Sequence, residues 1–253
     1  MLRFVILFLG LAFPALADII LAGSTTVSAR ILNPLQDDIK RVTGIAIRID
    51  GVGSTAGIKR LLAGECDAAI ISSQLKGIVE AEGINEPKLQ QHDLLEDLVV
   101  TAVNSKNQIK ALSGEQIQAL YSGKIKNWKE LGGPDVKVAV IIPHAESATR
   151  ELIYEFIMDK KVEFAKSARI AYGTKKEIVQ IAENEGGIGS ISKGYLGVYI
   201  EEMKNEKLSP ELREVEGKII SRPLAIVTKG DPSPEMLKLL AFLRTDQVKK
   251  KFK

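Results

Sequence analysis

The sequence predicts an α/β fold with largely parallel sheets, divided between two lobes. Short apolar runs alternate with amphipathic stretches along the chain, as expected for strands that alternate with helices. These units occur in two sets of different local composition, one in each half of the chain. A chain of 253 residues is long enough for two lobes of roughly 100 to 130 residues each.

The first set of units lies before residue 72. An apolar run ends at Gly23, a hydroxyl-rich loop follows, and an amphipathic stretch then continues to Arg41. The same order of strand, loop and helix returns after this, and the second helix ends at Gly64. The predicted strands are residues 19–22, 46–49 and 68–71, and the predicted helices are residues 27–41 and 56–63.

The second set of units begins with a long apolar strand. Ser113 and Gln116 then stand at the spacing of a capping box, which predicts a helix that ends at Tyr121. A further helix is predicted after Thr149, where apolar residues recur at helical spacing. The remaining predicted strands are residues 97–103, 137–142, 188–191 and 218–228, and a terminal helix is predicted over residues 234–250.

The charge and the metal-ligating residue types exclude several functional classes. Thirty-five Lys and Arg residues against 32 Asp and Glu residues give a formal net charge of +3, too balanced for a chain that coats nucleic acid. The single cysteine, Cys66, rules out an intramolecular disulfide or a multi-thiolate metal site, and two histidines leave little for an imidazole cluster. We predict a buried Cys66, no metal, no cofactor and no nucleic-acid partner.

Residues 1–17 have the pattern of a cleavable secretory signal peptide. Arg3 supplies a positive charge, the stretch from Phe4 to Phe13 is almost wholly apolar, and a small-x-small pattern ends at Ala17. The apolar run is shorter than the about 20 residues that a membrane-spanning helix needs. We therefore predict a mature chain that begins at Asp18 and is located in the periplasm, with no nearby cysteine to carry a lipid anchor.

Small hydroxyl residues follow four of the predicted strands. They are Ser24 to Thr26, Ser54 with Thr55, Ser72 with Ser73, and Ser147 with Thr149. A helix start presents unpaired N–H groups and about half a positive charge, and hydroxyls add short donors that leave room for a compact oxyanion. In doubly wound sheets such junctions lie at the carboxyl ends of the strands, where ligands bind. Serine and threonine are also the usual helix N-caps, so each junction alone has a purely structural explanation.

No enzyme motif competes with this interpretation. The sequence has no G-x-S-x-G, Walker A or H-E-x-x-H motif. A secreted hydrolase with Ser54 or Ser147 as nucleophile would need a general base within hydrogen-bond reach, and His144 is the candidate close in sequence. The sequence shows no third residue that would orient the His144 imidazole, so we predict a protein that is not an enzyme.

Six segments carry a resemblance to a known family. They are Gly23-Ser24-Thr25-Thr26-Val27, residues 51–59 (GVGSTAGIK), residues 62–67 (LAGECD), residues 121–133 (YSGKIKNWKELGG), Ser147-Ala148-Thr149-Arg150 and residues 221–230 (SRPLAIVTKG). Their order and spacing resemble the phosphate-binding proteins of bacterial ABC transporters. The resemblance covers essentially the whole chain after residue 17.

The resemblance implies a two-lobed, hinged fold of the periplasmic-binding-protein type II class. The chain would cross between the lobes near residues 100–104 and again near residues 221–228. Residues 18–101 with 222–253 would then form lobe 1, and residues 102–221 would form lobe 2. The implied function is capture of phosphate or a related oxyanion by a monomer, which delivers the ion to an ABC permease in the inner membrane.

The resemblance also implies which residues hold the ligand. Lobe 1 would supply the Thr26 side chain, the Val27 amide and Ser54, and lobe 2 would supply a loop that starts at Ser147. The full set of candidate binding residues is Thr25, Thr26, Val27, Ser54, Ser72, Ser147, Ala148, Thr149 and Arg150. Trp128 is interpreted as a core residue and not as a platform for the ligand.

The chain departs from the family pattern around the ligand. Family members usually carry an Asp or a Ser-Arg pair after the third strand, where this chain has Ser72-Ser73. The second-lobe loop usually reads G-S-G-T with an Arg upstream, whereas here it reads ESAT over residues 146–149, with Pro143 at the Arg position. The nearby cations are Arg150 and Arg30, each of which either faces the ligand or is an exposed helix-face charge. An oxyanion sensor or accessory binding protein with an altered ligand is therefore the alternative function.

Overall fold

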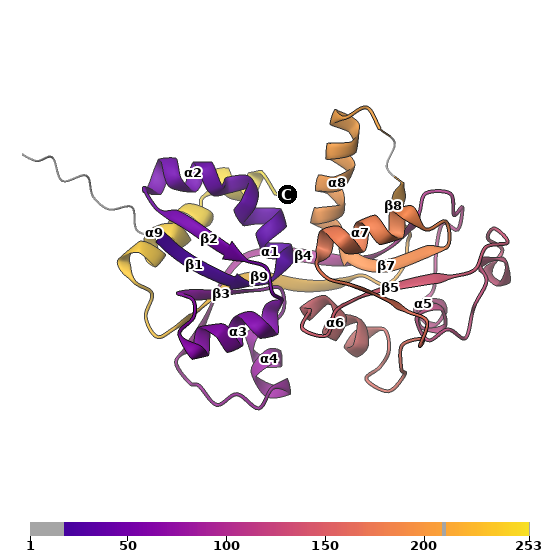
Figure 1. Ribbon diagram of the computed structural model, residues 1–253, viewed down its shortest axis with the longest axis horizontal. Helices are drawn as coiled ribbons and strands as arrows, with labels where there is room; N and C mark the ends of the chain where they lie inside the picture. The colour runs from indigo at the N-terminus through magenta and orange to yellow at the C-terminus, as the bar shows by residue number, and fades with distance from the viewer. Residues whose placement is uncertain (1–17, 209–210, 253) are drawn as a thin grey trace, which may run out of the picture.

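The computed structural model describes residues 18–208 and 211–252. Two lobes lie side by side and are joined by two long strands that run between them (Figure 1). The predicted signal peptide, residues 1–17, lies outside the described residues. Within the described part of the chain, no helix combines the length and the apolar character needed to cross a membrane.

Lobe 1 is built from the N-terminal units and the C-terminal helices (Figure 1). Its own strands are β1 (Asp18–Gly23), β2 (Ala46–Asp50) and β3 (Ala68–Ile71), and β1 pairs in parallel with both of the others. Its helices are α1 (Thr25–Val27), a π-helical segment (Ser28–Leu32), α2 (Asn33–Thr43), α3 (Ser54–Ala63), α4 (Leu75–Ala81), α9 (Pro234–Leu243) and α10 (Asp246–Lys250).

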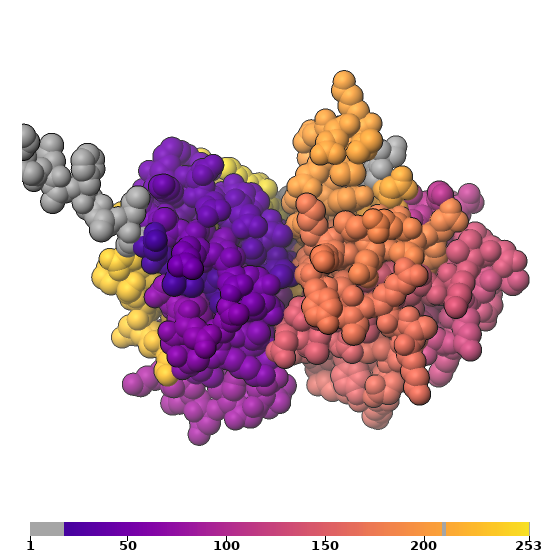
Figure 2. All heavy atoms as spheres, viewed as in Figure 1, coloured from indigo at the N-terminus to yellow at the C-terminus, as the bar shows by residue number. Residues whose placement is uncertain are grey.

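Lobe 2 contains the central part of the chain. Its strands are β5 (Ala139–Pro143), β6 (Arg169–Ala171), β7 (Gly187–Ser192) and β8 (Leu212–Glu214), and β5 pairs in parallel with β6 and β7. Its helices are α5 (Gly114–Tyr121), a 3-10 turn (Trp128–Leu131), α6 (Ala148–Phe156), α7 (Thr174–Glu183) and α8 (Lys193–Asn205). Figure 2 shows the two lobes in contact along a seam, with α8 standing out from the body of lobe 2.

Two antiparallel strands, β4 (Leu89–Asn104) and β9 (Ile220–Lys229), connect the lobes. β9 also pairs with β3 in lobe 1, and β4 also pairs with β7 in lobe 2. The described strands therefore join into one mixed sheet of order β2-β1-β3-β9-β4-β7-β5-β6, with β8 on β4. Asp97 and Arg222 lie directly opposite each other in the β4–β9 register, so their side chains emerge on one face where the lobes meet.

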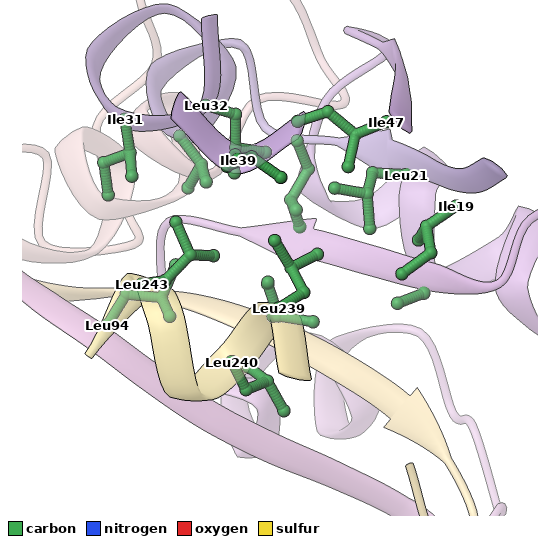
Figure 3. Close-up of a cluster of buried hydrophobic side chains, with 14 of the residues drawn as sticks. Ile19, Leu21, Ile31, Leu32, Ile39, Ile47, Leu94, Leu239, Leu240 and Leu243 are labelled. Atoms are coloured by element: carbon green, nitrogen blue, oxygen red, sulfur yellow. The ribbon is translucent and has the colours of Figure 1, made fainter. Parts of the chain in front are cut away.

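Each lobe has its own core on both faces of the sheet. In β3, Ile70 packs on one face and Ile71 on the other, and all four residues of this strand are buried. Figure 3 shows the first of these clusters, in which Leu21 of β1, Ile39 of α2 and Leu239 of α9 converge. Two further clusters cover the faces of the sheet in lobe 2. The lobes can therefore be rigid units, because neither depends on the other for its apolar core.

Several sequence predictions are confirmed. Ser113 and Gln116 form the predicted capping box, and the helix they start ends at Tyr121. Trp128 is a fully buried core residue whose indole N–H donates to the carbonyl oxygen of Gly186 at 3.0 Å. Cys66 is buried, and burial raises the pKa of its thiol. These predictions rested on local patterns, and tertiary contacts agree with them.

Two predictions about secondary structure are wrong. The sheet is not largely parallel, because every described pairing of β4 or β9 is antiparallel. The terminal helix predicted over residues 234–250 is two helices, because the chain leaves the helix at Arg244 and the Thr245 hydroxyl accepts from the Val248 amide to start α10.

Candidate functional site

Three helices begin at the lobe boundary without a side-chain N-cap. Gly53 precedes α3 with φ 99° and ψ 155°, and Gly173 precedes α7 with nearly the same geometry, φ 99° and ψ 152°. Ser147 precedes α6, but its hydroxyl makes no capping hydrogen bond. Ser54 is the first residue of its helix and not its cap. The hydroxyls at these junctions therefore do not serve as caps, which leaves helix-terminal donors for an anion.

Three threonines from the two lobes form a hydroxyl cluster. The Thr174 Oγ1 lies 3.1 Å from the Thr25 Oγ1 and 3.2 Å from the Thr26 Oγ1. The Thr174 amide also donates to the Thr25 Oγ1 at 3.4 Å. Thr174 is not among the ligand residues predicted from the sequence. Gly173 and Thr174 nevertheless follow a strand and start a helix, as Gly53 and Ser54 do. The strand before Thr174, β6, has only three residues and two of them are exposed, so the apolar pattern that marks the other junctions is missing.

Arg222 lies at the centre of the predicted site. Its guanidinium donates to the Thr149 Oγ1 at 2.7 Å, to the Ser72 Oγ at 3.4 Å and to the Thr26 Oγ1 at 3.5 Å. Thr26 and Ser72 belong to lobe 1 and Thr149 to lobe 2, so one side chain from the connecting strand β9 gathers hydroxyls from both sides. Arg222 is 2% exposed, and sequence reasoning treated it only as part of a lobe crossing.

A buried carboxylate holds Arg222 in place. The Asp97 Oδ2 accepts from Arg222 Nε at 3.1 Å and from Arg222 Nη2 at 3.0 Å. The Asp97 Oδ1 accepts from Arg30 at 2.5 Å and from the Ser192 hydroxyl at 2.9 Å. Burial lowers the pKa of Arg222 and Asp97 raises it, and a guanidinium stays protonated in either case. Two buried cations thus share one buried anion, which leaves a net positive charge beneath the hydroxyls.

The structure contradicts one of the two sequence alternatives for Arg30. Arg30 is 7% exposed, so it is not an exposed helix-face charge. Its guanidinium bonds to Asp97 and to the carbonyl oxygen of Phe252, and Gly194 of α8 packs directly against it, where a Cβ atom would overlap the guanidinium. Arg30 therefore stabilises the junction of lobe 1, lobe 2 and the C-terminus, and it adds its charge to the site through Asp97.

The other predicted ligand residues lie at the same boundary in different roles. The Ser54 hydroxyl accepts from the Ser72 amide at 3.1 Å, which ties two junctions of lobe 1 together. The Val27 amide donates to the Ser24 hydroxyl at 3.3 Å, so α1 is capped, unlike α3, α6 and α7. Ala148 is buried as the first residue of α6.

The predicted ligand residue Arg150 is engaged inside lobe 2. It donates to the carbonyl oxygen of Pro143 at 3.0 Å, and its guanidinium carbon lies 4.9 Å from the centre of the Phe164 ring. Its role in binding stays a prediction. The buried cation among the hydroxyls is Arg222.

The lobes touch at the edges of the hydroxyl cluster. Thr55 of α3 donates to the Glu151 carboxylate of α6 at 3.2 Å. Gly53 packs against the loop that contains Glu146, and a Cβ atom on Gly53 would overlap the Glu146 carbonyl oxygen. A hollow of about 640 Å³ opens between α4 and α6 and reaches Ser73 and Arg222. The described arrangement is therefore a closed one, with an approach from solvent beside the buried cation.

The geometry does not assemble a hydrolytic triad. The His144 ring stacks on Tyr172 with ring centres 5.6 Å apart, and no described hydrogen bond joins it to Ser54 or Ser147. Burial lowers the pKa of His144. Among the described residues, no group of three or more His, Cys, Asp and Glu side chains is arranged to hold a metal ion. What the arrangement can do is surround a small anion with hydroxyls, helix N-termini and a guanidinium.

Two lobes joined by crossing strands, with convergent hydroxyls between them, define a binding protein of the periplasmic type. Residues 14–246 match the sequence profile of the PBP superfamily domain, and the chain belongs to that family. Phosphate-binding protein PstS of Staphylococcus epidermidis is 27% identical over 228 residues, which cover 82% of this chain and 67% of that protein. Other PstS relatives are matched over 58% to 61% of their own length.

Solved structures of phosphate-transport proteins share the fold, and two of them are compared with this chain. A Clostridium perfringens protein, assigned as a phosphate ABC transporter substrate-binding protein and solved with bound phosphate, has 25% identity and a TM-score of 0.78. The match covers 92% of this chain and 95% of that chain. An ABC-type phosphate transport receptor from Vibrio cholerae has 27% identity and a TM-score of 0.66, with 92% and 96% of the two chains covered. The predicted two-lobed fold is therefore confirmed.

Proposed function

We propose that the protein captures phosphate between its two lobes and delivers it to an ABC permease. The observation that carries the proposal is the convergence of Thr26, Ser72 and Thr149 on the buried guanidinium of Arg222. The named relatives and the phosphate-bound structure of similar fold support the choice of ligand. In this proposal, Arg222 supplies the positive charge that an arginine at the position of Pro143 supplies in the family pattern.

The binding step needs no covalent chemistry. Hydroxyls and the helix N-termini of α3, α6 and α7 replace the water molecules of the ion, and Arg222 supplies a charge-assisted contact of roughly 1.5–3 kcal/mol. Neutral hydrogen bonds contribute about 1 kcal/mol each. The proposed ligand residues are Thr25, Thr26, Val27, Ser54, Ser72, Ser147, Ala148, Thr149 and Arg150 from the sequence, with Arg222 and Thr174 added from the geometry.

The proposal also covers the bending motion between the lobes and the cellular compartment of the protein. Residues 18–101 with 222–253 would move as lobe 1 and residues 102–221 as lobe 2, with bending in β4 and β9 where these strands leave one lobe for the other. The separate apolar cores of the lobes support such motion. We further propose that the protein is a non-enzymatic monomer in the periplasm, exported by residues 1–17.

Calorimetry with phosphate, sulfate and arsenate tests the ligand directly. Thr149→Val keeps the shape of the side chain and removes a hydroxyl that Arg222 bonds at 2.7 Å, so we expect phosphate affinity to fall by about 5- to 30-fold. Thr43→Val is the matched control, because the Thr43 hydroxyl is also buried but bonds within the end of α2. Wild-type protein that gives no heat with any of these ions would refute the proposal.

Closure of the lobes should depend on Gly53. An alanine there would place its Cβ atom against the Glu146 carbonyl oxygen across the lobe boundary, so the closed arrangement could not form. We expect Gly53→Ala to lower phosphate affinity about tenfold or more. Small-angle scattering should show that phosphate contracts the wild type and not the variant. Gly230→Ala is the control, because Gly230 has φ +80° but no atom within 4 Å of the added Cβ, so backbone strain occurs without the interlobe clash.

A further inference from the structure

A buried carboxyl group lies one helical turn beyond the hydroxyl cluster. Glu177 of α7 is 4% exposed, and its Oε1 atom has no hydrogen-bond partner among residues 18–208 and 211–252. It stands three residues after Thr174, so the two side chains share the face of α7 that packs on the sheet. A buried, unpaired carboxyl oxygen is costly to a fold, and its presence beside a binding site indicates a functional reason.

We propose that Glu177 is the proton-binding group of the anion site: its protonated form favours capture of the anion, and its ionised form opposes capture by offsetting the charge of Arg222. This inference rests on the proposed function, because it concerns the same site. It adds a residue that neither the resemblance nor the hydroxyl junctions indicate. Glu177 does not contact the anion itself. It acts through Arg222, because its ionisation changes the net charge that the anion meets at the guanidinium.

The charge balance of the buried groups explains the effect. Arg30 and Arg222 share Asp97, so this cluster carries a net positive charge that an incoming anion can neutralise. Ionised Glu177 would supply that negative charge from within the protein. The anion and the ionised carboxylate would then compete for one cation in a medium that screens charges weakly. Protonated Glu177 removes the competition.

The protonation state follows from burial. Burial raises the pKa of Glu177 to about 8, and the attraction of Arg222 only partly opposes this rise. The carboxyl is therefore mostly protonated at neutral pH and loses its proton on the alkaline side. A bound anion that favours the protonated form raises the pKa of Glu177 further. By linkage, the ratio of the acid dissociation constants of Glu177 in the free and bound protein is also the factor by which anion affinity falls as the pH rises through these pKa values.

Few other charges face Glu177 from the elements packed on α7. Arg222 of β9 and Tyr121 of α5 are coupled to it, and burial keeps the pKa of Tyr121 high, so its phenol stays neutral. β5 and β7 carry no titratable side chain, and Asp97 of β4 is committed to its two arginines. The other titratable or charged residues of α7, β4, β6 and β8 have exposed or half-buried side chains: Lys175, Lys176, Glu183, His92, Asp93, Glu96, Arg169, Arg213 and Glu214.

The test compares the pH dependence of phosphate affinity in two variants. Phosphate changes its own protonation state over the range from about pH 6 to about pH 9, so Glu177→Gln supplies the baseline for that contribution. We expect wild-type affinity to fall about tenfold more than that of Glu177→Gln across this range. Glu183→Gln makes the same chemical change on the exposed face of α7 and should follow the wild-type profile. Sulfate, which does not titrate in this range, should show the wild-type loss without correction.

A second experiment measures the titration of Glu177 directly by NMR and uses the wild-type protein. The carboxyl ¹³C shift of Glu177 in the wild-type protein should titrate above pH 7, and phosphate should move its midpoint upward. Identical pH profiles for wild type and Glu177→Gln, or a Glu177 carboxyl already ionised at about pH 6, would overturn the inference alone. Wild-type protein that binds neither phosphate nor sulfate would overturn the proposed function, and the inference with it.

Discussion

Replacing Arg222 with methionine will abolish most of the anion affinity, with a loss of at least about 100-fold. The change removes the proposed charge-assisted contact to the anion, worth roughly 1.5–3 kcal/mol. It also leaves Thr26, Ser72 and Thr149 without their shared partner, at about 1 kcal/mol for each hydrogen bond, and together these losses are enough for this effect. Calorimetry with phosphate measures the loss, and circular dichroism checks that the variant is folded. Asp97 keeps Arg30 as a partner, so the fold should survive.

Two variants separate the charge of Arg222 from its geometry. Arg222→Lys keeps the charge, but one ammonium cannot reach Thr149 while it also holds Asp97, so we expect an intermediate loss. Arg150→Met removes the other cation of the proposed ligand set, and we expect a smaller loss because Arg150 bonds to Pro143 and stacks on Phe164 within lobe 2. If Arg150→Met proves as damaging as Arg222→Met, the binding site is centred on α6 and our assignment of the cation is wrong.

The elements found from sequence are those with a local signature. Ser113 and Gln116 identify α5 because a capping box involves residues three apart. The apolar run over residues 68–71 matches β3, which is buried on both faces. β6 and α8 were not predicted, because β6 has two exposed residues of three and α8 has only Leu196 buried. Neither element produces the periodic apolar pattern on which the prediction depends.

The sequence predicted the hydroxyls of the candidate site, but the arginine that contacts them was missed for a physical reason. The hydroxyls of Thr26, Ser72 and Thr149 follow strands, and the end of a strand is visible in the sequence. Arg222 and Asp97 instead lie within strands, and their pairing depends on a register between segments 125 residues apart. No local pattern reports that register. An arginine directly before the apolar run from Pro223 to Val227 is the signal that could have identified it.

In the proposed function, the connecting strands β4 and β9 act as the hinge between the lobes, and they also carry the ion pair of Asp97 and Arg222. Because Arg222 belongs to β9 and Thr149 to lobe 2, any rotation of the lobes about these strands changes the 2.7 Å contact between them. Binding and closure are then coupled at one side chain, since the hydroxyls surround the guanidinium only when the lobes meet. The coupling requires that the ion pair beneath Arg222 stays intact as the lobes move.

That ion pair should be the most sensitive buried polar position in the protein. Asp97→Asn keeps the shape of the side chain but removes the negative charge between Arg30 and Arg222, so the two buried guanidiniums lose the counter-ion that they share. We expect the free energy of unfolding to fall by about 3–5 kcal/mol, measured by urea denaturation. Glu96→Gln is the matched control on the same strand. Glu96 is exposed and, within the described part of the chain, its carboxylate bonds only to the Ser221 hydroxyl, so the loss of stability should be below about 1 kcal/mol.

A double variant identifies the cause of the Asp97→Asn effect. If repulsion between unneutralised guanidiniums is responsible, adding Arg30→Met should restore part of the stability, because only one buried cation is then left. If the cause is instead the lost hydrogen bond from Ser192, the second change should lower stability further. An Asp97→Asn variant as stable as the wild type would mean that the strands, and not the ion pair, hold Arg222 beneath the hydroxyls.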